Sequence, residues 1–283
     1  MTTILVTGGN GQLASCIKDI SKVYNHFKFI YTNRQDLDIC DYSQLDNFFK
    51  LNTIDYCINC AAYTAVDKAE EDVEEAFLVN AIGAKNLAEA CKIHQITLMH
   101  ISTDFVFDGT KQSPYLETDS TNPLNIYGKS KLQGELEIQK ILDTYFIIRT
   151  SWLYSEYGNN FMKTMLRLAE SRKEISVVND QIGTPTYAGD LARVILHLID
   201  SKTKVYGEYH YSNLGEISWY DFANAIFKLS NKNIVLNPIN TVSYPTPANR
   251  PKYSVLDKSK ISKKLNVSIP YWDKSLELVI NKF

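Results

Sequence analysis

The stretch ILVTGGNGQLA at residues 4–14 decides the fold of this chain. An apolar run predicts a first strand, the small residues predict a tight turn, and a helix is expected to begin near Gln12. Gly8 allows the tight turn, Gly11 lets the backbone approach a pyrophosphate, and Ala14 permits close packing of the helix on the strand. The helix N-terminus then faces the anion. We therefore predict a dinucleotide-binding turn here; the alternative is an ordinary strand-to-helix turn.

The pattern that begins with this turn continues through residues 1–150, where short β-branched runs alternate with longer segments of helical period. The predicted strands are Ile4–Val6, Phe27–Thr32, Tyr56–Asn59, Thr97–Ile101 and Phe146–Arg149. The helical segments between them are expected to begin near Gln12, Tyr42, Glu74 and Tyr127, with Asp41 as the N-cap of the second. Such alternation predicts an α/β fold with a doubly wound parallel sheet of the Rossmann type.

The second half of the chain, residues 151–283, has a different texture. Helices are predicted near Asn160–Ser171, Gly189–Ser201 and Ser218–Ser230, and the longer loops between them carry several prolines. We predict a smaller α/β lobe that binds the substrate. Because no flexible linker separates the halves, this lobe is expected to be interleaved with the first domain and to share its core.

Composition and charge restrict the classes of partner. The chain has 283 residues, of which 45% are hydrophobic and 22% charged, and its formal net charge is −2 with acidic and basic residues interspersed. No basic stripe is available to neutralise a phosphate backbone, so nucleic-acid binding is disfavoured. The N-terminal residues lead directly into the first strand and the glycines, which resembles neither a signal peptide nor a membrane span. We expect a cytoplasmic protein.

The cysteines and histidines predict neither a disulfide framework nor a metal site. Five cysteines, an odd number, show no disulfide spacing, and the histidines show no metal-ligand spacing. Cys57 and Cys60 form a CxxC, but a separation of three residues in an extended segment places them on opposite faces of a strand. We interpret them as small buried hydrophobic residues.

The cofactor preference depends on the end of the second strand, which reads Thr32-Asn33-Arg34. An NAD-selective site would place an acidic residue there for the ribose hydroxyls. Arg34 instead favours a 2′-phosphate, so we predict NADPH, with NADH as the alternative. Because Asp36 and Asp38 lie close by, Arg34 can also be read as a solvated loop cation.

Polar side chains follow the fourth strand, where the chain reads Ser102-Thr103-Asp104. Ligands of open α/β folds bind at the carboxyl ends of the strands, so these hydroxyls and this carboxylate are expected at the site. A hydroxyl at Thr103 or Ser102 would position a substrate carbonyl.

A Tyr-Lys pair follows this segment. Tyr127 and Lys131 are one helical turn apart and therefore lie on one helix face. Delivery of a hydride to a ketone leaves an alkoxide that needs a proton, which a phenol can supply. The unperturbed pKa of a tyrosine, about 10, is high for neutral pH, and a neighbouring lysine cation is expected to lower it. Lys131 can also hold the nicotinamide ribose; the alternative is a solvated pair on a surface helix.

Longer strings of sequence carry a more specific resemblance. They are TGGNGQL at 7–13, NCAAYTAVDKAE at 59–70, STDFVF at 102–107, NPLNIYGKSK at 122–131, RTSWLY at 149–154, NNFMKTMLRL at 159–168, NDQIGTPT at 179–186 and YPTPANRP at 244–251. With these strings the chain closely resembles the dTDP-4-dehydrorhamnose reductases, the last enzymes of dTDP-L-rhamnose synthesis, in the extended short-chain dehydrogenase/reductase superfamily. The resemblance spans nearly the whole chain.

This resemblance implies an NADPH-dependent reduction of a nucleotide-linked 4-keto-6-deoxy sugar. It implies cofactor contacts from Gly11, Gln12, Leu13, Asp41, Tyr42, Ala62, Tyr63, Thr64, Tyr127 and Lys131, and substrate contacts from Thr103, Asp104 and Trp152. An indole can pack on a deoxysugar ring, and Arg250 in its proline-braced loop can pair bidentately with a pyrophosphate. The alternatives are a core position for Trp152 and a surface position for Arg250.

The residues that would determine the oligomeric state differ from those of the family. Metal-bridged dimers in part of this family use glutamates near the first helix and near residue 189, where this chain reads Ser15-Cys16 and Gly189-Asp190. We therefore expect a monomer or a homodimer that needs no metal.

Two rival functions share the expected fold. A nucleotide-sugar dehydratase needs a further acid, usually a Glu directly after the Thr-Asp pair, and that position is Phe105; an epimerase is disfavoured with it. The other rival is a non-catalytic NADP-binding subunit that regulates another enzyme, against which the intact Tyr127 and Lys131 speak. The residues leave open the stereochemistry of the sugar, the nucleobase and the polysaccharide that the product feeds.

Overall fold

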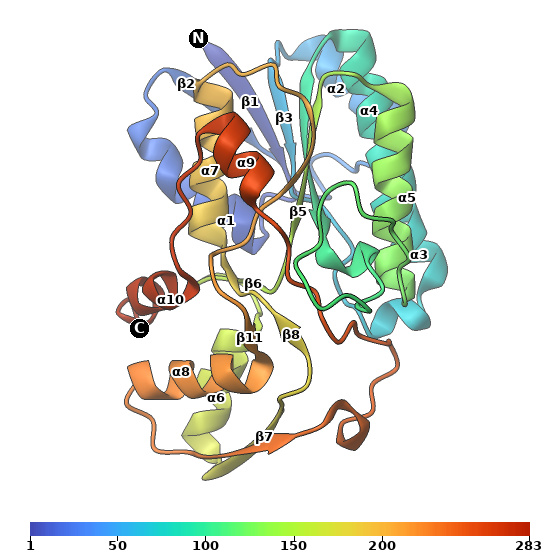
Figure 1. Cartoon of the computed structure of the whole chain (residues 1–283). Coiled ribbons are helices and arrows are strands. Elements are labelled where there is room, and N and C mark those ends of the chain that lie inside the picture. Colours follow the sequence, from blue (N-terminus) through green and yellow to red (C-terminus); the bar gives the residue numbers. More distant parts are fainter.

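Six parallel strands form the central sheet, in the order β10-β5-β4-β3-β1-β2, in the computed structural model, which describes residues 1–283 (Figure 1). The strands are β1 (Thr2–Thr7), β2 (Phe27–Tyr31), β3 (Tyr56–Asn59), β4 (Thr97–Thr103), β5 (Tyr145–Thr150) and β10 (Gly207–His210). The first five are the strands predicted from the apolar runs, and the doubly wound α/β fold is confirmed. Because the strand order reverses at β1, a crevice opens at the carboxyl ends of β1 and β3.

Helices cover both faces of the sheet, as Figure 1 shows. One face carries α1 (Gln12–Ile20), α7 (Ala188–Asp200) and α9 (Ser259–Leu265), and the other carries α2 (Tyr42–Leu51), α4 (Gly83–His94) and α5 (Ile126–Ile141). Successive strand residues point to opposite faces, so Ile4 and Val6 belong to the first core and Leu5 to the second. Cys57 and Cys60 divide in the same way, as their spacing predicts.

Side-chain caps fix where four of the helices begin, namely α2, α5, α6 (Phe161–Ser171) and α8 (Trp219–Leu229). The Asp41 side chain accepts a hydrogen bond from the backbone N–H of Gln44 at 3.0 Å, which confirms it as the N-cap of α2. The segment expected to form one helix from Glu74 is divided: α3 (Val73–Phe77) passes through a π-helical turn (Leu78–Ile82) into α4. Short 3₁₀ turns occur at Ser21–Val23, Lys68–Glu70, Asp104–Val106 and Thr241–Ser243.

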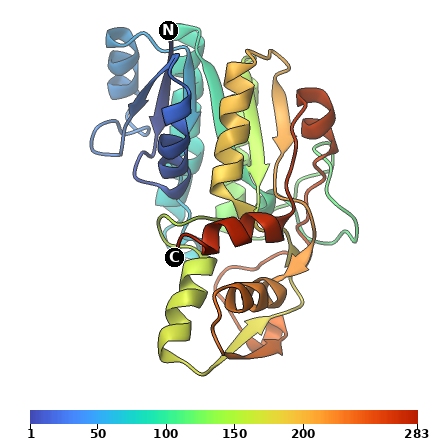
Figure 2. The ribbon, with the colours of Figure 1, turned by 90° about the vertical axis from the view of Figure 1, so that its left-hand side faces the viewer.

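A second, smaller layer of helices and short strands lies beneath the sheet (Figure 2). Its helices are α6 (Phe161–Ser171), α8 (Trp219–Leu229) and α10 (Trp272–Ile280). Its strands pair as β7 (Glu174–Val178) with β12 (Val235–Ile239), β8 (Ile182–Gly183) with β11 (Ile217–Ser218), and β6 (Leu153–Tyr154) with β9 (Thr186–Tyr187). Buried aromatic and aliphatic side chains from these elements, such as Tyr154 and Phe222, form a separate core.

Residues 151–283 do not all belong to this lower layer. Helix α7 packs on α1 against the main sheet, and β10 pairs with β5 in parallel register, Tyr209 opposite Ile148. The chain therefore returns to the first domain after building part of the second. None of its helices combines the length and the apolar character that a membrane crossing requires.

Candidate active site

The turn after β1 brings backbone close to the carboxyl end of β3. Gly8 has a φ of +64°, and a Cβ at this position would lie 2.7 Å from the backbone nitrogen of Ala61. Only glycine fits a turn that combines this backbone conformation with so close an approach. Gly11 is the N-cap of α1, and its N–H donates to the carbonyl of Gly8 at 2.8 Å. The turn thus exposes a helix N-terminus, where a pyrophosphate can bind.

A cavity of about 400 Å³ opens beside this turn. Its lining includes the predicted cofactor residues Gly8, Gly11, Arg34, Ala62 and Tyr63. This set joins the ends of β1, β2 and β3, as a dinucleotide site at the strand reversal requires.

The remaining predicted cofactor residues do not line this cavity. Asp41 caps α2, and Tyr42 packs against the core on the α2 face. Leu13 is buried in the other core and Thr64 is exposed. The Gln12 side chain is directed toward β6, where its Nε2 donates to the carbonyl of Leu153 at 3.3 Å.

Arg34 stands at the mouth of the cavity but already has carboxylate partners. Its guanidinium donates to Glu75 at 2.7 Å and to Asp38 at 3.3 Å, and its side chain is 63% exposed. A ligand phosphate at this position must therefore exchange with these carboxylates.

Tyr127 is a partly buried phenol on the first turn of α5, and Phe105 packs edge-on against its ring at 5.8 Å. Burial raises the pKa of Tyr127 to about 12, and Asp104 adds to the rise, whereas a hydrogen bond with Thr103 opposes it. This direction is opposite to the one expected from a neighbouring lysine. The phenol is fully protonated at neutral pH, which is the form that a proton donor needs.

The side chain of Lys131 is turned toward β4, which explains why it does not lower the pKa of Tyr127. Its Nζ donates to the carbonyl of Ile101 at 2.6 Å and lies 3.4 Å from Nε2 of His100. The side chain is buried, and burial lowers the pKa of Lys131 to about 8, although Glu135 and Cys60 act in the opposite direction. A shared helix face thus brings Tyr127 and Lys131 near each other without directing the ammonium at the phenol.

The residues at the end of β4 and directly after it include polar atoms that lack partners within the protein. Thr103 donates from Oγ1 to Oδ1 of Asp104 at 3.1 Å and accepts from the backbone N–H of Phe105. Burial raises the pKa of Asp104 to about 7. The second carboxylate oxygen of Asp104 and the hydroxyl of Ser102 are buried with no hydrogen-bond partner. Unpaired buried polar groups are costly, so a bound polar ligand would be stabilised here.

Trp152 has a left-handed backbone conformation that is rare for a bulky residue, with a φ of +46°. Its indole stacks on Trp219 with 3.6 Å between ring centroids, and its edge contacts Gly183, where a Cβ would lie 2.5 Å from the indole. The side chain is only partly buried. Strained residues of this kind are concentrated at binding sites.

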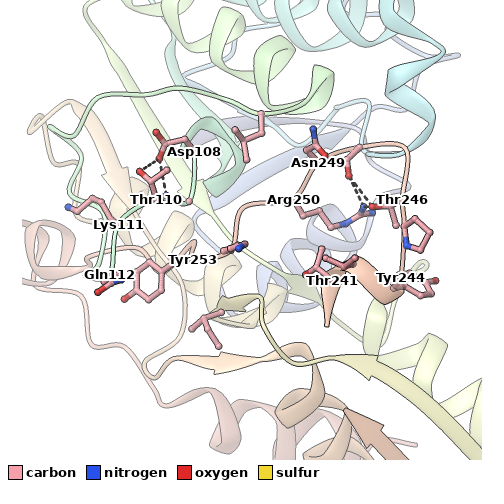
Figure 3. A pocket seen from close by; sticks show the side chains of 17 residues that line it. Asp108, Thr110, Lys111, Gln112, Thr241, Tyr244, Thr246, Asn249, Arg250 and Tyr253 are labelled. Carbon is pink, nitrogen blue, oxygen red and sulfur yellow. Dashed lines mark hydrogen bonds between the residues drawn. The ribbon is translucent and has the colours of Figure 1, made fainter. Parts of the chain in front are cut away.

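Arg250 holds the loop after β12 against the first domain. Its guanidinium forms a bidentate pair with Asp67, at 3.0 and 2.7 Å, and donates to the Thr246 hydroxyl at 2.5 Å. Figure 3 shows the guanidinium pointing at Thr246. Two cavities, of about 1030 and 900 Å³, share a wall of Tyr244, Thr246 and Arg250. The predicted substrate residue Arg250 therefore lies on a cavity wall with a carboxylate as its present partner.

Several residues that organise the site escaped the sequence reasoning. Asn80 pairs with both the N–H and the carbonyl of Tyr63 and donates to Ser130, so it joins the cofactor cavity to α5. It lies in the π-helical turn, which no periodicity indicated. Asn125 caps α5 and donates to the carbonyl of Asn249 at 2.7 Å. Its position just before a helix is a signal that could have been used.

Comparisons with known proteins identify the family. The chain matches the family described as the RmlD substrate binding domain over residues 1–283. A dTDP-4-dehydrorhamnose reductase of Aggregatibacter actinomycetemcomitans is 42% identical, over 98% of this chain and 98% of that protein.

Solved structures agree with the sequence match. A dTDP-4-dehydrorhamnose reductase from Clostridium acetobutylicum has a TM-score of 0.96 at 44% identity, and the match covers 99% of each chain. The dTDP-4-dehydrorhamnose reductase of Bacillus anthracis, solved in complex with NADP, has a TM-score of 0.95 at 40% identity, and the match covers 100% of each chain. These findings confirm the predicted resemblance: the chain belongs to the RmlD family, the family of the dTDP-4-dehydrorhamnose reductases.

Proposed function

We propose that this protein reduces the C4 keto group of dTDP-4-dehydro-L-rhamnose to give dTDP-L-rhamnose, with NADPH as the cofactor. The observation that carries the proposal is the position of the Tyr127 phenol, on the first turn of α5 beside Thr103 at the carboxyl end of β4. The glycine turn supports it, because Gly8 and Gly11 line a cavity at the N-terminus of α1 where the backbone can approach a pyrophosphate. The bound cofactor supplies the hydride.

The chain's own residues account for the proton. Thr103 is placed to hold the substrate carbonyl near the phenol, and Tyr127 donates its proton to the oxygen as the negative charge develops there. We assign to Lys131, whose Nζ donates to the carbonyl of Ile101, a hydrogen bond to the nicotinamide ribose and a positive charge near the reacting atoms. The unpartnered hydroxyl of Ser102 and the carboxyl of Asp104 offer hydrogen bonds to the sugar.

Trp152 and Arg250 are assigned to the rest of the substrate. The free area of the Trp152 indole can pack against the deoxysugar, with Trp219 as its support. Arg250 can exchange Asp67 for the pyrophosphate, since a guanidinium pairs bidentately with either group.

Phe105 argues against the dehydratase. Its ring lies against Tyr127, at the position where a dehydratase carries its additional acid. A phenyl ring cannot move the proton at C5 that dehydration requires. Turnover distinguishes the reductase from the rival function of a regulatory subunit, because a non-catalytic protein binds the cofactor without consuming it.

One experiment tests the proposal directly. The purified protein is supplied with dTDP-4-keto-L-rhamnose and NADPH, consumption of NADPH is followed by absorbance, and the product is identified by NMR. Formation of dTDP-L-rhamnose is expected. A product with a different configuration at C4 would reassign the sugar, and binding of NADPH without consumption would favour the regulatory subunit.

Arg34→Ala is expected to weaken NADPH binding more than NADH binding, because only NADPH offers a 2′-phosphate to the guanidinium. The exposure of Arg34 and its existing pairs with Glu75 and Asp38 limit the expected loss to about 1 kcal/mol. Dissociation constants for both cofactors, measured by fluorescence titration, give the comparison. The control is Arg167→Ala, on the exposed face of α6. Equal weakening of both cofactors would show that Arg34 does not read the phosphate.

We also expect activity without a divalent metal, from a monomer or from a homodimer that no metal holds. Mg²⁺ needs several oxygen ligands. Cys16 is buried, and the carboxylate of Asp190 accepts from Arg193 at 2.7 Å, Asn213 at 2.8 Å and Ser275 at 2.5 Å. Protein stripped with EDTA is compared with and without Mg²⁺ for activity and for mass by light scattering. A metal-dependent dimer, or activity restored by Mg²⁺, contradicts this expectation.

We infer a cytoplasmic site of action. All five cysteines are free thiols, and three of them are buried in the two cores of the main sheet. Thiols of this kind persist in a reducing compartment.

A further inference from the structure

A chain of buried polar side chains runs from the glycine turn to Lys131. The backbone N–H of Ala61 donates to Oδ1 of Asn59 at 3.2 Å, and the hydroxyl of Thr7 donates to the same oxygen at 2.7 Å. Nδ2 of Asn59 lies 3.1 Å from Nδ1 of His100, and Nε2 of His100 lies 3.4 Å from Nζ of Lys131. The four side chains of Thr7, Asn59, His100 and Lys131 are all 1–2% exposed. No water is needed to connect them.

The hydrogen-bond donors in this series of polar groups determine which ring nitrogen of His100 carries the hydrogen. A backbone N–H can only donate, so the atom of Asn59 that faces Ala61 must be the oxygen. The amide NH₂ of Asn59 then faces His100, and Nδ1 of the ring must accept. Burial and the nearby lysine hold the pKa of His100 well below its ordinary value, so the ring is neutral. A neutral ring that accepts at Nδ1 carries its hydrogen on Nε2, the atom that faces Lys131.

We infer that His100 is a positioning residue for Lys131, because it presents an N–H, and no acceptor, to the lysine ammonium. The ammonium gains nothing from the imidazole and is left for the carbonyl of Ile101, at 2.6 Å, and for the cofactor ribose. Asn59 and Thr7 fix the imidazole in this tautomer. The inference rests on the proposed function, since it concerns the lysine of that same site.

Two other groups around Lys131 also act on its pKa, and they do not reverse the lowering of that pKa. On its own helix, Glu135 favours the charged lysine, and from the end of β3 the Cys60 thiol acts in the same direction. Burial outweighs both and lowers the pKa of Lys131 to about 8. An acceptor at the position of His100 Nε2 would stabilise the ammonium and raise this pKa. The ammonium should therefore be lost, and activity should fall, as the pH rises through about 8 in the wild type.

The tautomer can be measured on the unmodified protein. A long-range ¹H–¹⁵N spectrum separates histidines with the hydrogen on Nε2 from those with it on Nδ1. The signals of His100 are assigned by their loss in His100→Gln. We expect the hydrogen on Nε2 and no titration of the ring above pH 5, a limit on the order of one unit below an ordinary histidine. A hydrogen on Nδ1 overturns the inference, because Nε2 would then accept from Lys131.

The effect on Lys131 is measured with His100→Gln, whose side-chain oxygen can accept from the ammonium. Lysine labelled with ¹³C at Cε is titrated by NMR, and the Lys131 signal is identified by its loss in Lys131→Met. The variant should raise the pKa of Lys131 by about one unit. The matched control is His197→Gln, because His197 is exposed on α7, and it should leave this pKa unchanged. An unchanged Lys131 titration in His100→Gln contradicts the inference.

The pH profile of kcat/KM links the lysine to the reaction. In His100→Gln the decline on the alkaline side should move to higher pH by the same amount as the NMR titration. A shifted titration with an unmoved profile would show that His100 sets the charge of Lys131 without positioning it for the reaction. The two NMR measurements need no turnover. If the protein reduced no sugar while they gave the expected results, the proposed function would fail and the arrangement of Lys131 would stand.

Discussion

Tyr127→Phe is expected to lower kcat by about 100-fold or more, the usual size of the effect when a general acid is removed. The substitution deletes only the phenol hydroxyl, so the packing of the ring against Phe105 is retained. Because the hydroxyl is needed to protonate the sugar oxygen and not to bind the cofactor, the affinity for NADPH should be nearly unchanged. The loss should therefore fall on the chemical step.

Single-turnover measurements with saturating NADPH and the keto sugar separate this step from binding, and fluorescence titration gives the cofactor affinity. Tyr24→Phe is the matched control, since Tyr24 is also partly buried but lies beside the short turn after α1, away from the cavities. If Tyr127→Phe kept more than about half of the wild-type rate, general acid catalysis by this residue could not be maintained.

Lys131→Met is expected to damage both turnover and cofactor binding, because the lysine is assigned two tasks. Loss of a charged hydrogen bond to the ribose should weaken NADPH binding by about 1.5–3 kcal/mol. Loss of the nearby cation should add a reduction in kcat, so that kcat/KM falls by about 100-fold or more. Methionine is unbranched and close in length to lysine, so it can occupy the same buried space without a charge.

The comparison between the two variants is the sharper test. Tyr127→Phe should change kcat alone, whereas Lys131→Met should change kcat and the NADPH dissociation constant together. Lys129→Met, on the exposed side of the same helix, controls for loss of a lysine from α5. Unaltered NADPH affinity in Lys131→Met would remove the ribose contact from the assignment.

Local sequence determined the backbone architecture of the first domain. Strand and helix periods differ, so the apolar runs and the helical segments located β1 to β5 and most of their helices. The glycine turn and the Asp41 cap followed from single residues, because each depends on a backbone conformation that few residue types support. The spacing of Tyr127 and Lys131 likewise placed them on one helix face. All of these features join residues close together in the sequence.

Tertiary packing decided the chemistry of the side chains. Burial raises the pKa of Tyr127, and the turn of Lys131 toward Ile101 and His100 keeps its ammonium from lowering it. Spacing along a helix determines on which face two side chains leave the backbone. The neighbouring strand determines where those side chains point and how far water is excluded from them. That information depends on residues far away in the chain, which a local pattern does not contain.

The same limit applies to the substrate residues. The residue types in the sequence pointed to Trp152 and Arg250 as substrate residues. They could not show that Trp219 stacks on Trp152 or that Asp67 pairs with Arg250. Both partners are distant in sequence: Trp219 meets Trp152 when the elements of the second lobe pack together, and Asp67 meets Arg250 when that lobe lies against the first domain. The sequence by itself therefore determined the fold, the family and the candidate groups, because these follow from local periodicity and short motifs. The three-dimensional structure decided their protonation, partners and orientation, because electrostatics and hydrogen bonding depend on the atoms packed around each group.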